Sequence, residues 1–226
     1  MKKEKKQVFI PKGIFYHIGS FLLFYLVAIP VLFIVNIFLG VRIKGRKNLK
    51  AVKKTGGVTI ANHIFALDCE IVAFALLAKR PWFLMHYWSF DIPVAGMLAR
   101  LLGGVPTVKN KIKDTKRLFD ELETEIHKGR IVHIFPEGES ISYDRNLRPF
   151  FKGAFRLSIN TKTPIGVMLF SYRKRSWFAR IFFKKPALVL NVFPPVYPTE
   201  NEAPDVYMNR VFEMMHGYQK ELENGK

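Results

Sequence analysis

The sequence has little cysteine and few acidic residues. A single cysteine, Cys69, among 226 residues excludes an intrachain disulfide framework and a metal site built from several thiolates. Glycine (15) and proline (13) are not in excess and hydrophobic residues make up 49%, so neither a collagen-like nor a disordered chain fits. Only 18 acidic residues face 36 lysines and arginines, a net charge of +18. This balance indicates a polyanionic partner, either a nucleic acid or an anionic membrane surface.

Charge is absent from residues 13–41, where 29 positions contain no Asp, Glu, Lys or Arg. The apolar part, residues 21–41, is long enough for a hydrocarbon core, for which ~20 residues suffice. Basic residues flank the run on both sides, so both ends suit the cytoplasmic face of a membrane. Pro30 interrupts a regular helix, and a straight span and a re-entrant helical pair fit equally well. We therefore expect residues 1–41 to be a basic N-terminus and a membrane segment.

A signal peptide and a buried core helix are the alternatives for this segment. The apolar stretch of a signal peptide is roughly 7–15 residues long and ends at a small-residue cleavage site, whereas this run is longer and contains no Ala-x-Ala. A core helix of a soluble domain has a polar face, which residues 21–35 lack. The sequence therefore favours a lipid environment.

Short β-rich runs alternate with stretches of helical spacing after Val41. The expected strands are residues 58–61, 82–85, 105–108, 131–135, 164–170 and 187–192, and the expected helices are residues 67–78, 94–102, 115–127 and 205–222. In the third helix, Asp114 is the expected cap and Gly129 the expected stop. We predict a single α/β domain over residues 42–226, with a mixed, mostly parallel sheet covered by helices and a membrane-associated helix or helix pair before it.

A histidine and an aspartate follow the first expected strand. His63 comes directly after it, and Asp68 lies five residues later, where a helix is expected to begin. Five positions on one regular helix differ by about 140°, so the two side chains would not meet there. With His63 in the loop, the imidazole can fold over the Asp68 carboxylate, which then fixes the tautomer of a general base. A turn-capping histidine beside a first-turn acid is the structural alternative.

These residues begin a series of blocks that resembles the glycerolipid (lysophospholipid) acyltransferase family. Asn62, His63 and Asp68 match its N-H-x4-D motif. Residues 103–109 read GGVPTVK and are similar to its G-G-[IV]-P-V-x-R block, with Lys109 in the place of the arginine.

The third and fourth blocks of the same resemblance are less complete. Residues 135–138 read FPEG, but the chain continues with Ser140 where the family's F-P-E-G-T-R-S has its arginine. Residues 149–153, PFFKG, match the segment that usually follows. Residues 164–168, PIGVM, lack the second proline of P-I-x-P-V. Four blocks in order are more specific than any one of them.

The resemblance implies acyl transfer from a thioester, either acyl-CoA or acyl–acyl carrier protein, to the free hydroxyl of a lysophospholipid. His63 would remove the hydroxyl proton, Asp68 would orient the imidazolium, and backbone N–H groups near the strand ends would hold the oxyanion. Glu137 and Gly138 match the motif on the acceptor side. The resemblance implies no further cofactor and no covalent acyl-enzyme.

The two missing arginines affect phosphate recognition, because a lysine is only a point charge and a serine has none. Other cations flank the same motifs, namely Lys109, Lys111, Arg145, Arg148 and Lys152. We expect Lys109, Arg148 and Lys152, with Glu137 and Gly138, to bind the substrate. Lysophosphatidic acid is the predicted acceptor, giving phosphatidic acid, and a non-phosphatidic lyso-lipid is the alternative.

Other reactive residues are expected to be structural. Cys69 would point about 100° away from Asp68 on a helix, so we expect it in the core. The histidines at 86, 127, 133 and 216 lack metal-ligand spacing, so no metal is expected. Basic residues at 173–175 and 184–185 bracket the aromatic residues Trp177, Phe178, Phe182 and Phe183, as on a surface facing lipid headgroups or in a solvated basic loop.

Two other classes of function remain as alternatives. A nucleic-acid-binding protein would satisfy the net charge, but no helix-turn-helix, zinc-finger or RNP-type pattern is present and the apolar segment would have no role. A non-catalytic membrane adaptor would not need His63, Asp68, Glu137 and Gly138 together. We therefore expect a membrane-bound acyltransferase that has no nucleic-acid partner.

Overall fold

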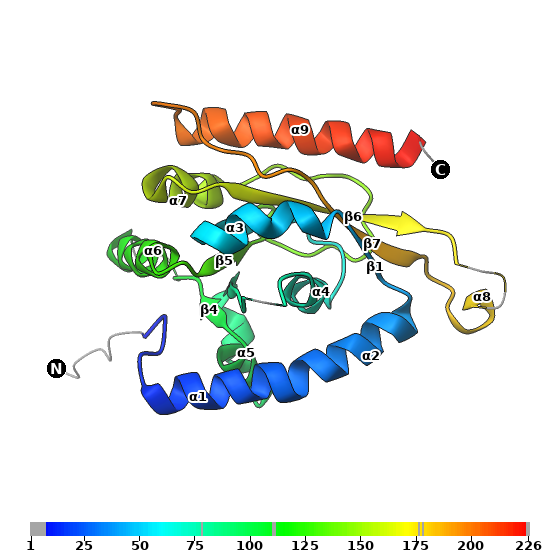
Figure 1. The fold of residues 1–226 in the computed structure, drawn as a ribbon, viewed down its shortest axis with the longest axis horizontal. Helices are drawn as coiled ribbons and strands as arrows, with labels where there is room; N and C mark the ends of the chain where they lie inside the picture. The colour runs from blue at the N-terminus through cyan, green and yellow to red at the C-terminus, as the bar shows by residue number, and fades with distance from the viewer. Residues whose placement is uncertain (1–7, 78, 110–111, 176, 178, 225–226) are drawn as a thin grey trace.

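The computed structural model describes residues 8–77, 79–109, 112–175, 177 and 179–224, and Figure 1 shows their arrangement. Expectations that involve Lys111, Phe178 and the basic residues before position 8 lie outside these residues. The described residues form a seven-stranded sheet in the order β1-β7-β6-β2-β5-β3-β4. The strands are β1 (Arg42–Lys44), β2 (Gly57–Ile60), β3 (Trp82–Met85), β4 (Gly104–Pro106), β5 (Ile131–Ile134), β6 (Ile165–Arg173) and β7 (Ala187–Val192).

The sheet is mixed and mostly parallel, as predicted. β6 and β7 are antiparallel, and the other neighbouring pairs are parallel. In the central pair, Gly57 is opposite Ile131 and Ile60 is opposite Ile134. Every residue of β2 and β5 is buried, because helices cover both faces of a parallel sheet of this kind. The six strands expected from the sequence are all present.

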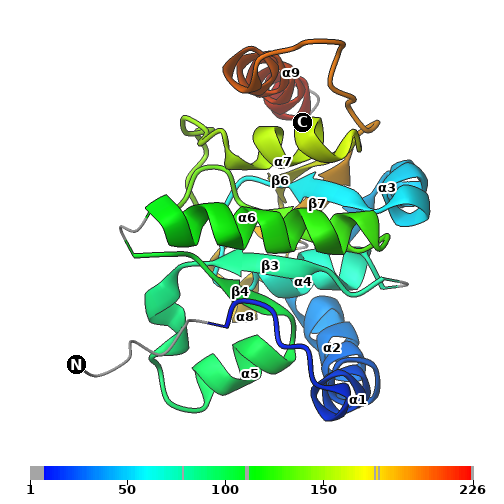
Figure 2. The same ribbon diagram turned by 90° about the vertical axis from the view of Figure 1, so that its left-hand side faces the viewer.

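Helices form a layer on each face of the sheet (Figures 1 and 2). α6 (Ile112–His127), α7 (Gly153–Thr161) and α9 (Pro204–Asn224) cover one face. α3 (Lys50–Thr55) and α4 (Asp68–Ala75) cover the other, and the apolar N-terminal segment packs on the outer side of α4 and α5 (Ala95–Leu101). The other short elements are α8 (Ala179–Phe182) and the 3₁₀ turns η2 (Arg46–Leu49) and η3 (Tyr87–Phe90).

Helix α6 shows the expected apolar periodicity but begins earlier than predicted. Leu118, Leu122 and Ile126 are buried against the sheet. Asp114 lies inside the first turn, and its carboxylate is 3.7 Å from Arg117 Nη2. The prediction that Asp114 caps this helix is therefore wrong, because the helix already includes Ile112.

The apolar N-terminal segment is one continuous helical run, not a pair of helices. It consists of α1 (Ile14–Leu22), a π-helical segment η1 (Leu23–Ala28) and α2 (Ile29–Leu39). The wider π turns precede Pro30, whose missing N–H and bulky ring would otherwise break the regular helix. The chain therefore passes Pro30 without a turn, so of the two arrangements that the sequence left open, a single helix and a re-entrant pair, the structure has the single helix.

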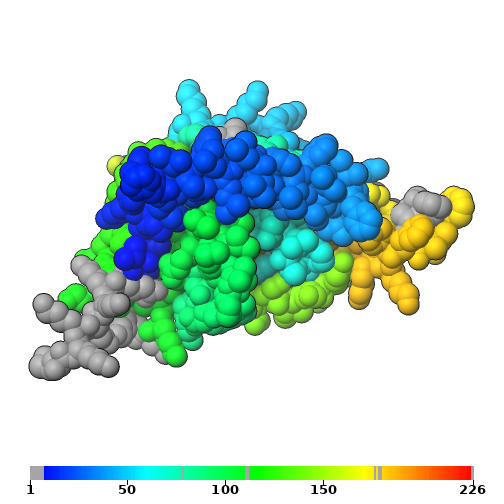
Figure 3. Space-filling view, turned by 90° about the horizontal axis from the view of Figure 1, so that it is seen from below, coloured from blue at the N-terminus to red at the C-terminus, as the bar shows by residue number. Residues whose placement is uncertain are grey.

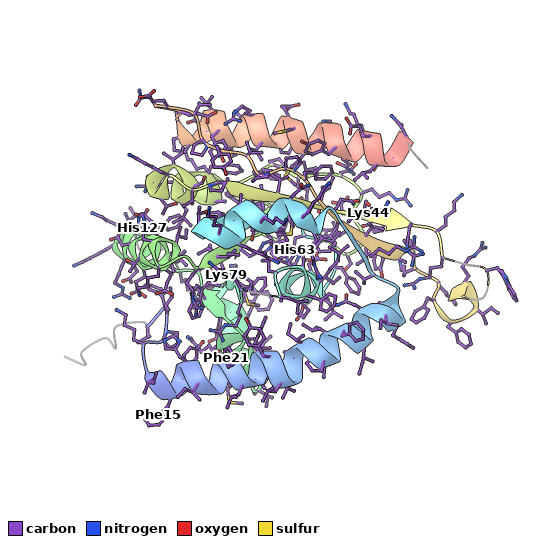
Figure 4. The ribbon with its side chains drawn as sticks, in the orientation of Figure 1. Phe15, Phe21, Lys44, His63, Lys79 and His127 are labelled. Carbon is purple, nitrogen blue, oxygen red and sulfur yellow. The ribbon has the colours of Figure 1, made fainter. Side chains whose placement is uncertain are left out.

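This 26-residue helix, Ile14–Leu39, is long and apolar enough to cross a membrane by length and composition. It lies alongside the α/β domain, and Phe15 projects away from the domain in Figure 4. Only Ser20, Phe24 and Asn36 within it are buried. The segment is therefore not a buried core helix. Figure 3 shows that the helix, the region of α5 and α8 share one face of the molecule.

Candidate active site

The candidate site lies where β2 and β5 end. These strands are parallel neighbours, so the loops that follow them meet at the same edge of the sheet. The loop after β2 is fixed by Asn62, whose Oδ1 accepts the Phe170 N–H at 2.7 Å and whose Nδ2 donates to the Phe170 carbonyl at 3.3 Å. Asn62 thus ties this loop to β6, and His63 takes its position from that anchor.

His63 and Asp68 are in contact, as the sequence spacing predicted. His63 Nδ1 lies 3.0 Å from Asp68 Oδ2, with His63 in the loop and Asp68 as the first residue of α4. The same carboxylate oxygen accepts the N–H groups of Ile64 at 2.7 Å and Phe65 at 2.8 Å. The Asp68 side chain is fully buried, whereas the His63 side chain is 22% exposed. Nε2 is therefore the imidazole nitrogen left to accept a proton.

Burial raises the pKa of Asp68, while the hydrogen bonds from His63, Phe65 and Ile64 act in the opposite direction. The backbone N–H groups of Ile64 and Phe65, near the end of β2, donate to this carboxylate. The Gly138 N–H, after β5, donates to the Phe135 carbonyl at 3.1 Å. None of these three N–H groups is free to stabilise an oxyanion.

The imidazole of His63 is also held by an aromatic stack that the sequence analysis missed. The Phe135 ring stacks on it, with centroids 4.0 Å apart and an interplanar angle of 14°. The ring of His133 meets Phe135 edge-on at 4.5 Å. His133 is fully buried, its Nδ1 lies 2.9 Å from Thr59 Oγ1, and burial lowers its pKa to about 3. The pattern in the sequence that indicates these contacts is the two-residue spacing of His133 and Phe135, which puts both side chains on one face of an extended segment.

Glu137 and Arg148 form a buried pair beside His63. Arg148 Nε donates to Glu137 Oε2 at 3.0 Å, and Arg148 Nη2 donates to the same oxygen. Nη2 also donates to the His63 carbonyl at 3.2 Å, and the His63 N–H lies 3.4 Å from Glu137 Oε2. Burial raises the pKa of Glu137 and the guanidinium opposes this shift. The pair thus fixes the backbone on both sides of His63.

Gly138 occupies a backbone conformation that needs glycine. Its φ is +78°, and a Cβ at this position would lie 2.7 Å from Cε2 of Phe151. The Phe151 N–H donates to the Pro136 carbonyl at 2.7 Å, which keeps this segment against the loop after β5.

The remaining predicted site residues lie outside this set of contacts. Lys109 is exposed, and its Nζ lies 5.5 Å from the centroid of the Tyr87 ring. Lys152 is exposed and lines a cavity of about 760 Å³ together with residues of α6 and α7. Ser140 is exposed and brings no charge. The structure thus brings together His63, Asp68, Glu137, Gly138 and Arg148, and the roles of Lys109 and Lys152 in substrate binding stay predictions.

Cys69 has no role in this arrangement. Burial and the neighbouring acids Glu70 and Asp68 raise the pKa of its thiol, so the reactive thiolate is disfavoured. Among the described residues, no group of three or more His, Cys, Asp and Glu side chains could hold a metal ion. The chemistry available at this sheet edge is proton abstraction by an oriented imidazole.

Comparison with known proteins agrees with this geometry. The model of the family described as Acyltransferase matches residues 40–170, which contain His63, Asp68, Glu137 and Arg148. The chain belongs to this family. A "1-acyl-sn-glycerol-3-phosphate acyltransferase BAT2, chloroplastic" of Brassica napus is 32% identical over 123 residues, which are 54% of this chain and 35% of that protein. The match thus spans about a third of the relative's length.

The fold of this chain is also found among solved structures. The crystal structure of the 1-acyl-sn-glycerophosphate (LPA) acyltransferase PlsC from Thermotoga maritima superposes with a TM-score of 0.62 at 19% identity. The superposition covers 92% of this chain and 87% of the other. The mixed sheet with its helices is therefore the fold of that protein.

Proposed function

We propose that this acyltransferase moves a fatty acyl group from a thioester donor to the free hydroxyl of lysophosphatidic acid, giving phosphatidic acid. The contact of 3.0 Å between His63 Nδ1 and Asp68 Oδ2 carries the proposal, since it orients a partly exposed imidazole for proton abstraction. The names of the Brassica napus relative and of the PlsC structure support this choice of acceptor.

The reaction needs one base and no covalent intermediate. His63 Nε2 takes the proton of the acceptor hydroxyl as its oxygen attacks the thioester carbonyl carbon. The tetrahedral intermediate then breaks its C–S bond, and the leaving thiolate takes the proton from the imidazolium. Asp68 stabilises the imidazolium during both steps, and the Glu137–Arg148 pair keeps the backbone of His63 in place. Acyl-CoA and acyl–acyl carrier protein both supply this thioester chemistry.

We propose that the enzyme acts at the cytoplasmic face of a membrane, held by the N-terminal helix. Phe15, Ile34 and Phe38 on this helix are 87%, 65% and 68% exposed, which is unfavourable in water. The segment around α8 adjoins the end of the helix, because the Phe38 and Phe183 rings meet at 5.0 Å. Arg173 Nη2 also donates to the Gly40 carbonyl at 2.7 Å.

The regions of α5 and α8 share one face of the molecule with the helix (Figure 3), and both carry exposed apolar side chains. Trp88, Val94 and Met97 before and within α5 are 54%, 67% and 59% exposed. Ile181 of α8 is 66% exposed, and Lys184 and Lys185 follow it. Apolar side chains beside cations favour an anionic membrane surface.

A different acceptor is the second candidate, and one observation favours it. Arg148 is engaged by Glu137, and Ser140 replaces the arginine of the third block, so neither position offers a free guanidinium to a phosphate. An acceptor without a phosphate monoester would need no such group.

An acceptor comparison distinguishes the two candidates. The full chain is assayed with one thioester donor and with lysophosphatidic acid, a zwitterionic lyso-lipid or monoacylglycerol as acceptor. We expect lysophosphatidic acid to have the highest kcat/KM, and Lys109→Ala to raise the KM of the acceptor more than that of the donor. Equal use of monoacylglycerol, with no effect of Lys109→Ala, would support the second candidate.

A further inference from the structure

A basic pocket lies at the opposite edge of the sheet from His63. Lys79 and Arg80 precede β3, and Arg130 precedes β5, so these residues lie where the two parallel strands begin. The pocket has a volume of about 420 Å³ and is lined by His17, Phe21, Tyr25, Lys79, Arg80, Lys128, Gly129 and Arg130. The four residues of β5 separate it from the active-site edge by ~13 Å of extended chain. It is therefore distinct from the site described above.

Arg80 is a buried cation whose hydrogen-bond partners are neutral. Arg80 is only 7% exposed. Its Nη1 donates to Ser20 Oγ and, at 3.2 Å, to the Leu101 carbonyl. None of the ion pairs found within the described residues involves Arg80. A buried charge is costly unless an opposite charge compensates it.

The guanidinium of Arg130 lies nearby and increases the cost of burying the charge of Arg80. The guanidinium carbons of Arg80 and Arg130 lie 5.3 and 5.8 Å from the centroid of the Trp82 ring. Burial lowers the pKa of Arg80, the neighbouring Tyr16 opposes this shift, and the charge of Arg130 adds to it. Two like charges close to one buried indole would be stabilised by an anion bound between them.

The carboxylate of Glu125 compensates only part of the positive charge around the pocket. It lies 2.8 Å from Lys128 Nζ and 3.9 Å from Arg130 Nε. Lys79 Nζ instead donates to the Gly129 carbonyl at 2.8 Å. Four cations thus surround the pocket, and Glu125 is the carboxylate paired with two of them.

The remaining wall of the pocket comes from the apolar helix. Phe21 and Tyr25 contribute their rings, and Phe21 is 57% exposed. Figure 4 labels Phe21 and Lys79, which come from the apolar and the basic wall. The basic wall therefore meets the same helix that carries the exposed apolar side chains.

We propose that this pocket binds the phosphate group of an anionic phospholipid, whose acyl chains lie along the N-terminal helix. The lipid supplies the counter-charge for Arg80 and Arg130 and fixes the helix against the α/β domain. A free phosphate offers the same charge without the chains. The lipid part of this inference rests on the proposed membrane association, whereas anion binding does not.

Binding is measured by calorimetry on the full chain with soluble dihexanoylphosphatidylglycerol, with dihexanoylphosphatidylcholine and with inorganic phosphate. We expect the anionic lipid to bind more tightly than the zwitterionic one. Arg130→Gln and Lys128→Gln should each weaken this binding by roughly tenfold, the usual effect of losing one charge-assisted hydrogen bond. Both side chains are partly exposed, so these variants should fold.

The controls separate this pocket from other basic surfaces and from the active site. Arg156→Gln and Lys220→Gln remove the same charges from exposed positions elsewhere and should leave the affinity unchanged. His63→Ala should also bind normally, so a failure of the proposed catalytic function would not affect this result. Binding of phosphate as tightly as the lipid would assign the pocket to free phosphate and overturn the lipid proposal. Binding that is insensitive to Arg130→Gln and Lys128→Gln, or equally weakened in the controls, would refute the site.

Discussion

The guanidinium of Arg148 donates through two nitrogens to one carboxylate oxygen of Glu137, 11 residues earlier in the chain. The side chains are 15% and 1% exposed, so this pair is largely removed from water. Because Arg148 also donates to the carbonyl of His63, the pair connects the loops after β2 and β5. Arg148, which the sequence suggested as a substrate ligand, is thus engaged within the protein.

Replacing Arg148 by Met should lower the free energy of unfolding by about 3 kcal/mol, because it leaves the buried Glu137 carboxylate without a counter-charge. The loss should be smaller at low pH. Burial already raises the pKa of Glu137, and protonation of the variant's carboxyl removes the uncompensated charge. Urea denaturation at pH 5 and pH 8 measures both effects. A double variant, Glu137→Gln with Arg148→Met, should regain part of the stability, and no recovery would contradict the role of the pair.

Gly138→Ala should lower the free energy of unfolding by about 1–2 kcal/mol, the usual cost of a left-handed conformation for a residue with a Cβ. Contact with the Phe151 ring adds to this cost. Gly217→Ala is the matched control, because Gly217 lies within α9 and a Cβ there has nothing within 4 Å. That change should stabilise the helix by about 0.5–1 kcal/mol. Thermal unfolding that ranks the two variants in the opposite order would argue against the constraint at Gly138.

His133 should make the protein less stable as the pH falls. Its pKa is about 3 in the folded state against the ordinary value of 6.5, so the unfolded chain binds the extra proton between these values. The contribution of His133 is complete above pH ~6.5 and is lost on acidification by up to ~1.4 kcal/mol per pH unit. His133→Asn should flatten the fall in stability from pH 6.5 to 4. His127→Asn, on the surface of α6 (Figure 4), controls for loss of a histidine, and equal profiles for both variants would contradict the assignment.

The full chain should sediment with membranes and resist release by high salt, because salt does not screen the burial of apolar surface. Ile34→Asp and Phe38→Asp place a charge on the exposed side of the helix and should shift the protein toward the supernatant. Val206→Asp is a similar change on α9, where the side chain is 55% exposed, and should have no effect. Complete release by salt alone would show that the basic surface, and not the helix, holds the protein.

The sequence predicted the main strands and the His63–Asp68 contact because both depend on strong local patterns. Buried parallel strands such as β5 are continuous apolar runs, and the loop position of His63 followed from the end of one of them. The edge strand β1 was missed because charged residues, Arg42 and Lys44, flank its single half-buried side chain. Helix α7 was missed because it starts with Gly153 and contains Ser and Asn, which favour turns.

The rest of the site depends on contacts between distant segments. Nothing in the local sequence of Arg148 distinguishes a side chain that binds substrate from one that pairs with Glu137. The stack of Phe135 on His63 likewise joins two loops that are separated by more than 70 residues. The π segment that carries the N-terminal helix past Pro30 is set by packing as well as by sequence, since Phe24 within it is buried in the core.

The rate of acyl transfer to lysophosphatidic acid by the His63→Ala variant tests the central claim most directly. The variant should fold normally and lose activity by roughly 10²–10⁴-fold, the usual contribution of a general base. Asp68→Asn should lose less, because some imidazole keeps the productive tautomer, and Cys69→Ser should stay active. An active His63→Ala enzyme together with an inactive Cys69→Ser enzyme would contradict the general-base mechanism.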